Sequence, residues 1–447
     1  MLGTAKRIYQ AIPSFLTYPI IRFFSLTPIF SRKHWQNVVE LEETLKTESP
    51  SNLVGRNLTL LAKEIERIPY YNRNIYTKFK TTPNIGNLVE LPFLDNQEVR
   101  NFADELIDES VPGYYTSTGG TGGSPLKIYL SNKSYFVDRN HAFMAWSKLG
   151  YGRGDLKLTL RGVHLHDKLA HFNPMNNEIL INIFLLNDNN IERIVSIINK
   201  YNPVFGHGYP SAWYSFALLI NKKKIIPEFK LKGIFFASES VSNTKREFVE
   251  SIFHVKARAT YGFSERAGFA FESFESPGEY LVSHVYGLVE IINANGDNVS
   301  EGEEGEIVCT GFINEAMPLL RYRTGDYATA KKIDQGLITV ICNIKARRDD
   351  FILDRLGNKV HAAALIVHPK SQYEFRYIQL FQKTKGFLEL KLVPIGEPNK
   401  NALMEIQREY QQKLPYITVE AKFSSMEELT ITHRGKIPYL VKQYDNR

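Results

Sequence analysis

The sequence predicts an α/β protein with a large N-terminal domain and a small α+β C-terminal domain. Three observations carry this prediction. The chain has 447 residues, which is too long for one ordinary compact core. Strand-like and helix-like segments alternate from about residue 110 to residue 253, as in sheets covered by helices. The last hundred residues show a separate pattern, in which strands surround one polar helix.

The N-terminal domain begins with a predicted basic and apolar extension over residues 1–50. Residues 9–30 are rich in Ile, Leu, Phe and Tyr, but Pro13, Pro19 and Pro28 interrupt them. No run of about 20 apolar residues therefore spans a bilayer, and no clear signal-peptide cleavage site follows. We favour short helices packed on the protein over the alternative, a peripheral membrane contact. A polar stretch at residues 41–51 then precedes a predicted helix at residues 53–68.

The middle of the chain supplies most of the expected sheet. Strands are predicted at residues 157–161, 179–186, 203–205 and 232–237, and helices at residues 191–201, 211–220 and 242–253. Strands dominate residues 287–341, which predicts a smaller β-rich subdomain. In the last unit, strands are expected at residues 377–382, 387–393 and 418–423, and a helix at residues 401–413. The predicted domains are therefore residues 1–346 and 347–447.

Composition limits the classes of partner. A net charge of +7 favours anionic partners such as ATP, CoA or an anionic membrane, but a solvated basic surface explains it equally well. Nucleic-acid binding is disfavoured, because no basic stripe with interleaved aromatic residues occurs. Cys309 and Cys342 each lie in an apolar, strand-like run. We expect buried free thiols in a reducing cytoplasm rather than a catalytic cysteine or a zinc site.

A glycine-rich segment, Tyr115-Thr-Ser-Thr-Gly-Gly-Thr-Gly-Gly-Ser-Pro-Leu-Lys127, is the strongest local signal. Its glycines let the backbone approach a ligand and present successive amides to phosphate oxygens. Hydroxyl side chains add further donors. No Gly-Lys-Ser/Thr closes the segment, so it is not a P-loop of the Walker type. A phosphate-binding loop is favoured over a flexible surface turn.

Two further segments suggest the rest of a nucleotide site. In Ala259-Thr-Tyr-Gly-Phe-Ser-Glu265, Tyr261 can lie against a flat base and Glu265 can offer a hard oxygen ligand to Mg²⁺. In Pro318-Leu-Leu-Arg-Tyr-Arg-Thr-Gly-Asp326, the carboxylate of Asp326 can accept hydrogen bonds from two vicinal ribose hydroxyls. Taken alone, each segment fits ordinary packing or a hairpin turn equally well.

Taken together and in this order, the three segments resemble the AMP-forming adenylating superfamily, from about Tyr70 to the C-terminus. Within it, the chain resembles the phenylacetate–CoA ligase branch, which includes the CapK-like proteins of capsule polysaccharide biosynthesis. The features that select this branch are Ile68-Pro-Tyr-Tyr-Asn, the Thr-Gly-Gly-Thr form of the glycine loop, Gly206-His-Gly-Tyr-Pro-Ser211, and Asn314-Glu-Ala-Met-Pro before Arg-Tyr-Arg-Thr-Gly-Asp.

The resemblance implies a large adenylate-forming domain with a mobile C-terminal lid. It implies that ATP and Mg²⁺ activate a carboxylic acid to an acyl-adenylate, that pyrophosphate leaves, and that CoA then accepts the acyl group. The ATP phosphates would lie against the glycine loop, formed by Ser117, Thr118, Gly119, Gly120, Thr121, Gly122, Gly123 and Ser124.

The resemblance also implies individual roles outside the loop. Tyr261 and Gly262 would lie by the adenine, Glu265 would bind Mg²⁺, and Asp326 would hold the ribose. Ala346-Arg-Arg-Asp-Asp350 resembles the hinge motif, with Arg347 as a second ribose contact and Asp349 as the pivot. Thr432-His-Arg-Gly-Lys436 resembles the lysine motif of the lid. The Lys436 ammonium would neutralise charge on the α-phosphate and the attacking carboxylate. Without the other motifs, a solvated tail lysine would be the default.

Two departures from the family pattern leave alternatives open. Gly122 stands where the family commonly carries Ser or Thr, and Ser124 where it often carries Lys. Both changes remove phosphate contacts, so turnover would be slow unless Lys127 compensates. A non-catalytic nucleotide-binding homologue is therefore one alternative. The CapK resemblance leaves another, transfer to an amine or hydroxyl in cell-surface polysaccharide assembly.

The histidines suggest two weaker hypotheses. His164-Leu-His-Asp167 invites a metal site, but no third and fourth ligands are in view. Lining of an acyl pocket or loop packing is favoured there. His207, together with Tyr209, is a better candidate for the acyl pocket, and a structural hydrogen bond at a tight turn is an equal alternative for His207. The acid itself and the oligomeric state are not determined by the sequence.

Overall fold

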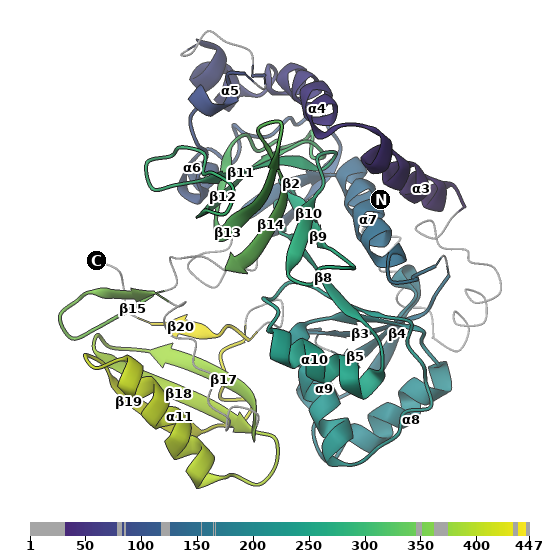
Figure 1. Cartoon of the computed structure of the whole chain (residues 1–447), viewed down its shortest axis with the longest axis vertical. Coiled ribbons are helices and arrows are strands. Elements are labelled where there is room, and N and C mark those ends of the chain that lie inside the picture. Colours follow the sequence, from purple (N-terminus) through teal and green to yellow (C-terminus); the bar gives the residue numbers. More distant parts are fainter. Residues whose placement is uncertain are drawn as a thin grey trace.

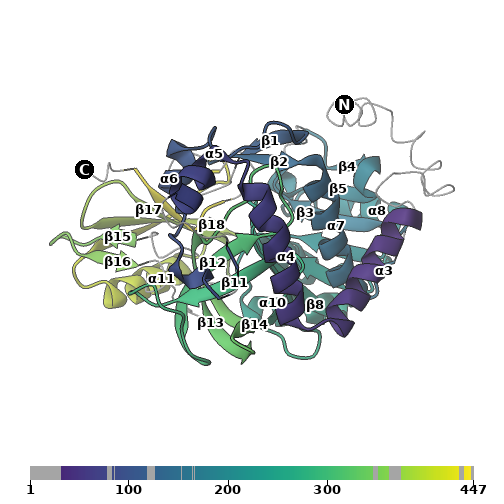
Figure 2. The same cartoon turned by 90° about the horizontal axis from the view of Figure 1, so that it is seen from above.

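A computed structural model describes residues 32–77, 83–84, 86–117, 126–152, 154–163, 165, 167–345, 351–361, 374–431 and 437–443. One large sheet and one small sheet organise the chain, and helices cover both (Figure 1). The small sheet lies beside the large one at the end opposite the first described helix (Figures 1 and 2). The predicted α/β class is therefore confirmed. The predicted N-terminal extension before residue 32 lies outside the described residues.

In the described part of the chain, twelve strands form the large sheet in the order β11-β12-β13-β14-β10-β9-β8-β7-β6-β3-β5-β4. One half is mostly parallel and consists of β3 (Lys157–Arg161), β4 (Ala170–Asn173), β5 (Glu178–Asn182), β6 (Phe205–Gly208), β7 (Ile234–Phe236) and β8 (Ala257–Gly262). The other half is antiparallel and consists of β9 (Phe269–Glu272), β10 (Glu279–Val282), β11 (Gly287–Ile292), β12 (Glu304–Gly311), β13 (Tyr322–Asp334) and β14 (Leu337–Lys345). The β-rich region expected from the sequence thus joins the parallel half through β8.

Helices cover both faces of the parallel half. The helices α8 (Ile191–Tyr201), α9 (Pro210–Lys222) and α10 (Asn243–Phe253) pack on one face, where apolar side chains of β3 and β5 meet them in one core. The helix α7 (Asn132–Ser147) covers the other face, where Phe143 and Trp146 contact Phe205 and Phe235. The strand β7 is therefore buried on both faces, because Ile234 and Phe236 belong to the first core and Phe235 to the second.

The N-terminal third precedes the large sheet and packs on it. It contains α3 (Arg32–Thr47), α4 (Pro50–Ile65), α5 (Pro69–Tyr71), the π-helix η2 (Asn72–Thr77), the 3-10 helix η3 (Leu88–Glu90), α6 (Asn96–Asn101), and the hairpin strands β1 (Gly113–Ser117) and β2 (Lys127–Ser131). Short 3-10 helices η4 (Pro174–Asn176) and η5 (Ile183–Leu185) follow later. In the described residues, no helix is long and apolar enough to cross a membrane.

The C-terminal sheet has its own hydrophobic core. A hairpin of β15 (Phe351–Leu353) and β16 (Lys359–His361) leads into β17 (Phe375–Gln382), β18 (Phe387–Pro394), α11 (Lys400–Lys413), β19 (Thr418–Phe423) and β20 (Leu440–Lys442). The sheet order is β19-β18-β17-β20, and Ile406 and Tyr410 of α11 pack on it. Polar contacts join it to the large sheet, because Lys222 Nζ donates to the Ile395 carbonyl at 3.2 Å and Arg376 donates to the Ile183 carbonyl at 3.1 Å.

Two strands were predicted with the wrong bounds, and a helix extends into a polar stretch for which no structure was predicted. The strand expected at residues 203–205 is instead β6, Phe205–Gly208, because the backbone of β6 pairs with β3 from Lys157 onward. The strand expected at residues 179–186 ends at Asn182, whose side chain accepts a hydrogen bond from the Phe184 amide and starts a 3-10 turn. The polar stretch at residues 41–51 is helical as far as Thr47, since α3 buries Val38 and Leu41 against α7.

Candidate active site

Two segments far apart in the sequence meet where β8 ends. Tyr261 belongs to β8 and Asp326 to β13, and the Tyr261 hydroxyl donates a hydrogen bond to Asp326 Oδ2 at 3.0 Å. The Asp326 amide donates to Thr324 Oγ1 at 3.0 Å, which fixes the turn that carries the carboxylate. Burial, and then the charge of Asp326, raises the pKa of Tyr261 well above its usual value. The phenol therefore stays protonated and remains a donor to Asp326.

Glu265 lies in the connection between β8 and β9 and is only 3% exposed. The Tyr322 hydroxyl lies 2.9 Å from Glu265 Oε1 and 2.6 Å from Asn96 Oδ1. Tyr322 comes from the same segment as Asp326, so one stretch of β13 orients both carboxylates. A buried carboxylate needs such partners, because an unpaired charge in the interior is strongly unfavourable.

The next residue in this turn ties it to α7. Arg266 has a left-handed φ of 55°. Its guanidinium donates to Ser134 Oγ at 2.9 Å and to the Tyr114 hydroxyl at 3.2 Å. Because Ser134 belongs to α7 and Tyr114 to β1, the turn that carries Glu265 is fixed to the strand that leads into the glycine loop and to the helix that follows β2.

The residues around Glu265 fit a Mg²⁺ ion that takes most of its ligands from the nucleotide and from water. In the described residues, no group of three or more His, Cys, Asp or Glu side chains could hold a metal ion. A magnesium ion here would therefore take one protein carboxylate, with nucleotide phosphates and water as its other ligands. This is the usual arrangement for Mg²⁺ bound together with phosphates.

The glycine loop connects β1 to β2, which pair in antiparallel register from Gly113 opposite Ser131 to Ser117 opposite Lys127. The predicted phosphate contacts Thr118 to Ser124 lie outside the described residues, and of Ser117 the backbone alone is described. Lys127 Nζ lies 3.9 Å from the centroid of the Tyr115 ring, so in this structure it makes a cation–π contact at the base of the loop.

Two side chains that the sequence analysis did not single out hold the loop strands against the Asp326 segment. Asn314 Oδ1 accepts the Ser131 amide at 2.8 Å, and its Nδ2 donates to the Tyr129 carbonyl at 3.0 Å. The Tyr71 hydroxyl donates to the Pro318 carbonyl at 2.8 Å and accepts the Leu320 amide at 3.1 Å. The Pro-Tyr-Tyr and Asn-Glu-Ala-Met-Pro motifs, both recognised only as signatures, therefore position the Arg-Tyr-Arg-Thr-Gly-Asp segment.

His207 and Tyr209 lie on and just after β6, which is separated from β8 by β7. The His207 ring centroid is 4.9 Å from that of Trp146. Burial, helped by nearby Lys157 and Arg161, lowers the pKa of His207 to about 3, so the ring is neutral. Gly208 between them has a φ of 139°, and a Cβ atom there would lie 2.0 Å from the Leu160 carbonyl oxygen. Only glycine fits this position.

A charged cluster beside His207 was missed by the sequence analysis. It consists of Arg139, Lys157, Arg161, Glu178 and His207. Arg161 pairs with Glu178 at 3.1 Å, and the other members surround this pair. The alternation of polar and apolar residues in Lys157-Leu-Thr-Leu-Arg161 was a signal that one face of this strand is polar.

Several predicted features lie partly or wholly outside the described residues. His164 and His166 of the weak metal hypothesis do so, as do the hinge residues Arg347 and Asp349 and the lysine Lys436. Thr430 and Pro438, described residues on either side of Lys436 in the sequence, are both hydrogen-bonded to Gln379. Its Nε2 donates to the carbonyls of Thr430 and Pro438, each at 3.0 Å, and its Oε1 accepts the Thr430 amide at 2.9 Å.

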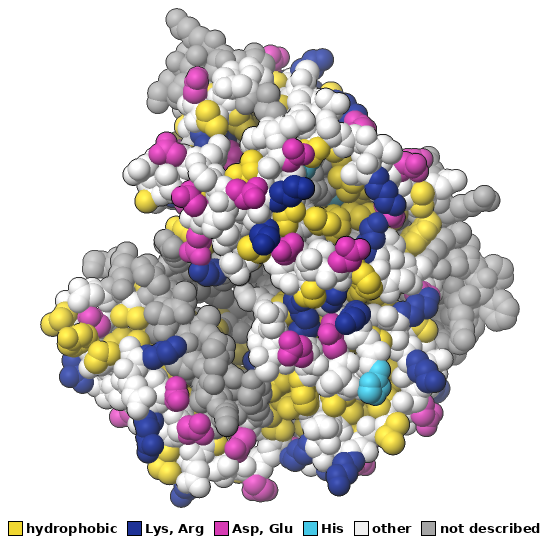
Figure 3. Space-filling view, in the orientation of Figure 1, with side chains coloured by type: hydrophobic (Ala, Val, Ile, Leu, Met, Phe, Trp, Pro, Cys, Tyr) yellow, Lys and Arg dark blue, Asp and Glu magenta, His cyan; other side chains and the backbone are white. Residues whose placement is uncertain are grey.

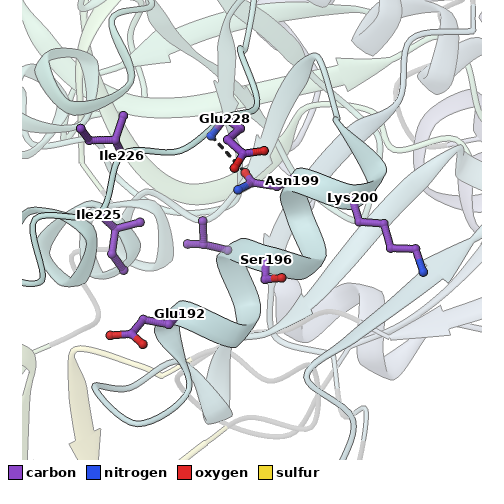
Figure 4. A pocket seen from close by; sticks show the side chains of 8 residues that line it. Glu192, Ser196, Asn199, Lys200, Ile225, Ile226 and Glu228 are labelled. Atoms are coloured by element: carbon purple, nitrogen blue, oxygen red, sulfur yellow. Dashed lines mark hydrogen bonds between the residues drawn. The ribbon is translucent and has the colours of Figure 1, made fainter.

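Other expectations concern thiols, charge and cavities. Both cysteines are free; Cys309 is buried and Cys342 half-buried. On the face shown in Figure 3, Lys and Arg side chains alternate with Asp and Glu and form no basic stripe. A surface pocket lies between α8 and the segment after α9, where the Glu228 amide donates to Asn199 Oδ1 (Figure 4). None of the predicted site residues lines it.

Comparison with known proteins identifies relatives of this chain. No protein-family model matches it. It is 26% identical over 251 residues to the protein CapK of Staphylococcus aureus, covering 54% of either chain. It is 27% identical over 390 residues to the phenylacetate-coenzyme A ligase of Thermus thermophilus, covering 80% of this chain and 84% of the ligase. The match with CapK thus spans about half of that protein.

Solved structures show the same fold. A 2-hydroxyisobutyryl-CoA ligase in its post-adenylation state, with a bound acyl-AMP, superposes with a TM-score of 0.65 at 16% identity, covering 88% of this chain and 89% of the ligase. The same ligase in its CoA-bound thioesterification state gives a TM-score of 0.52 over the same shares. The chain therefore has the fold of the adenylate-forming ligases and is similar in sequence to their phenylacetate-CoA ligase and CapK branch.

Proposed function

We propose that this protein is an AMP-forming acid ligase. It would activate a carboxylic acid with ATP to an acyl-adenylate, release pyrophosphate, and then transfer the acyl group to CoA. The observation that carries the proposal is the hydrogen bond from Tyr261 to Asp326. This bond joins two motifs that are 65 residues apart at the carboxyl end of a parallel strand, where α/β sheets bind their ligands. Similarity to phenylacetate-CoA ligases over 80% of the chain supports it.

The described residues suit the adenylation step. Asp326 has a fixed carboxylate that can accept both ribose hydroxyls once the nucleotide replaces the Tyr261 donor. Glu265, oriented by Tyr322, would hold Mg²⁺ against the phosphates. The bound ion would supply a Lewis acid that withdraws charge from the phosphate oxygens. The acid's carboxylate oxygen then attacks the α-phosphorus in line, and the bond to the pyrophosphate oxygen breaks.

The remaining roles rest on the motif resemblance. We assign the phosphate contacts to the loop of Ser117 to Ser124, the second ribose contact to Arg347, and charge neutralisation at the α-phosphate to Lys436. In this proposal residues 347–447 form a domain that turns about Asp349 between the two steps. Such a movement excludes water during adenylation and later admits the thiol.

The place of action is proposed from the two free cysteines, which suit a reducing cytoplasm. A peripheral membrane contact through residues 9–30 is proposed as a secondary property, supported by their apolar and basic composition. Co-sedimentation of the full chain with phosphatidylglycerol vesicles, compared with a chain lacking residues 1–31, tests it. Equal sedimentation of the two chains would reject it.

The activity is tested by ATP–pyrophosphate exchange with pooled carboxylic acids. Acid-dependent exchange, followed by CoA-dependent release of AMP, is the expected result. Exchange without a CoA effect would keep the adenylation step and point to an amine or hydroxyl acceptor. ATP binding without exchange for any acid would favour a non-catalytic nucleotide-binding protein.

A further inference from the structure

The charged cluster of Arg139, Lys157, Arg161, Glu178 and His207 lies on one face of the large sheet. In the strand register, Lys157 is opposite both Glu178 and Phe205, and Thr159 is opposite His207. Paired residues of neighbouring strands point to the same face. The apolar partners of this face, Phe205 and Phe235, pack on α7. The charged side chains therefore gather between the sheet and α7, the helix that carries Arg139.

Glu178 needs no further partner. It is 2% exposed, and its two oxygens accept hydrogen bonds from Thr159 at 2.9 Å, Arg161 at 3.1 Å, Asn173 at 2.8 Å and Asn176 at 3.0 Å. Although burial opposes ionisation, the charges of Arg161 and Lys157 hold the pKa of this carboxyl well below its usual value. Glu178 is therefore one negative charge among three basic side chains.

Lys157 lies at the base of the cluster and is 1% exposed. Its Nζ donates to the Asn176 carbonyl at 2.6 Å and lies 5.2 Å from the centroid of the Trp146 ring. Burial, together with the positive charges of Arg139 and Arg161, lowers the pKa of Lys157 to about 7 although Glu178 opposes the shift. The positive charges of Arg139 and Arg161 near Lys157 are thus not balanced by the single negative charge of Glu178.

Several polar atoms of the cluster and of its neighbours Tyr151 and Asn173 are buried without a partner. Among the described residues, these are Arg139 Nε, Tyr151 Oη, Arg161 Nε, Asn173 Oδ1 and His207 Nδ1. Leaving one such atom unpaired costs about 1–3 kcal/mol, so clusters of them call for an explanation. Arg161 is 36% exposed at its side chain, and Arg139 and His207 are half-buried. The cluster is therefore buried at Lys157 and Glu178. Its open side is formed by Arg139, Arg161 and His207, which are partly exposed.

The open side faces the edge of the sheet that carries the nucleotide site. Arg161 ends β3, Gly208 ends β6 and Gly262 ends β8, and the strands β3, β6, β7 and β8 are neighbours and parallel. At roughly 4.8 Å between strands, Arg161 begins about 14 Å from Tyr261. An arginine side chain reaches several ångströms back along this edge. The length of this span is comparable to that of a small acid with polar groups at both ends.

We propose that the cluster binds a second negatively charged group of the acid substrate, through Arg161, Arg139 and His207, while the reacting carboxylate lies at the nucleotide. The preferred substrates are then small dicarboxylic acids or acids with another anionic tail, rather than acids with an apolar tail such as phenylacetate. This inference rests on the proposed adenylation activity. Bidentate arginine contacts explain why a carboxylate fits well.

The test compares matched acids in ATP–pyrophosphate exchange with the full chain. The pairs are phenylacetate with 4-carboxyphenylacetate, and hexanoate with adipate. We expect kcat/KM to favour the diacid of at least one pair by about 100-fold, since sites built for a polar group reject analogues that lack it. Arg161→Gln should lower this diacid-to-monoacid ratio at least 10-fold, mainly through KM, and Arg161→Lys should restore part of it.

Arg193→Gln, on the exposed side of α8, is the matched control and should leave the ratio unchanged. Arg139→Gln provides a second variant if Arg161→Gln fails to fold. A preference for monoacids, or an equal fall for both acids in the Arg161 variant, overturns the inference and leaves the activity in place. No exchange with any acid overturns the proposed function instead, and the inference with it.

Discussion

The proposed nucleotide site and the charged cluster lie along one edge of the same sheet but differ in how many of their polar atoms already have partners. At the nucleotide site each carboxylate already has a tyrosine hydroxyl within hydrogen-bond distance, Tyr261 for Asp326 and Tyr322 for Glu265. In and beside the charged cluster, five buried polar atoms of the described residues have no partner, three of them on cluster members. The first region is organised in advance for a ligand of fixed geometry. The second leaves hydrogen bonds for a ligand to complete.

Lys436→Ala tests the proposed nucleotide site and has the largest expected effect. Removing a cation that faces developing charge costs roughly 100- to 1000-fold in rate. Exchange should fall by this factor for diacids and monoacids alike, because the proposal places the lysine at the α-phosphate. The measurement is kcat/KM for exchange with both members of an acid pair. A loss confined to one acid would place Lys436 at the acyl group instead.

Lys157→Met tests the charged cluster through stability. Because the pKa of Lys157 is lowered from 10.5 to about 7 in the folded chain, the unfolded chain binds more protons between these values. Stability should therefore rise as pH increases from about 7 to about 10, by up to a few kcal/mol. The variant should lose this rise. Denaturant unfolding at several pH values measures it, with Lys200→Met as the exposed control, and a rise that persists in Lys157→Met contradicts the assignment.

Tyr322→Phe tests how strongly the proposed nucleotide site depends on the hydroxyl of Tyr322. The change leaves buried Glu265 and Asn96 without this hydroxyl, which should destabilise the fold by about 1–3 kcal/mol. The Mg²⁺ concentration needed for half-maximal exchange should rise as well, because Glu265 is less well oriented. Unfolding curves and magnesium titrations give the two quantities. An unchanged Mg²⁺ concentration for half-maximal exchange would show that Glu265 does not bind the metal.

Tyr261→Phe has the smallest expected effect. It removes one hydrogen bond to half-buried Asp326, worth about 1 kcal/mol, so KM for ATP should change by only several-fold. The change should be the same for every acid, in contrast to Arg161→Gln. Initial-rate kinetics with varied ATP measure it. An acid-dependent change would mean that Tyr261 contacts the acyl group.

Sequence patterns predicted most of the parallel half of the sheet, since buried apolar strands and amphipathic helices leave clear periodic signals. The strand β3 and the helix α8 were predicted with the bounds that the structure has. The sequence also singled out Tyr261, Glu265 and Asp326 as candidates, but not the hydrogen bonds from Tyr261 to Asp326 and from Tyr322 to Glu265. Such contacts depend on how β8 and β13 approach each other, which no local pattern contains.

The charged cluster was missed for a related reason. The helix α7 that covers it lies between the two halves of the sheet and buries Ser134, Asn140 and His141 along with its apolar residues. A helix surrounded on several sides has no polar face, so its sequence shows little amphipathic period. The sequence pattern of residues 157–161 predicts a strand but does not show that α7 covers its polar face.

Gln379 is fully buried. It binds both Thr430 and Pro438, so these two residues stay close to β17. Lys436 stands two residues from the Pro438 anchor, and an extended chain covers at most about 7 Å over that distance. Our proposal therefore expects Lys436 to move together with the C-terminal sheet rather than by itself. If the Lys436 ammonium acts in the first step and leaves before the second, the whole C-terminal sheet must carry it. Substitution of Gln379 should therefore weaken the coupling between the movement of this sheet and the two reaction steps.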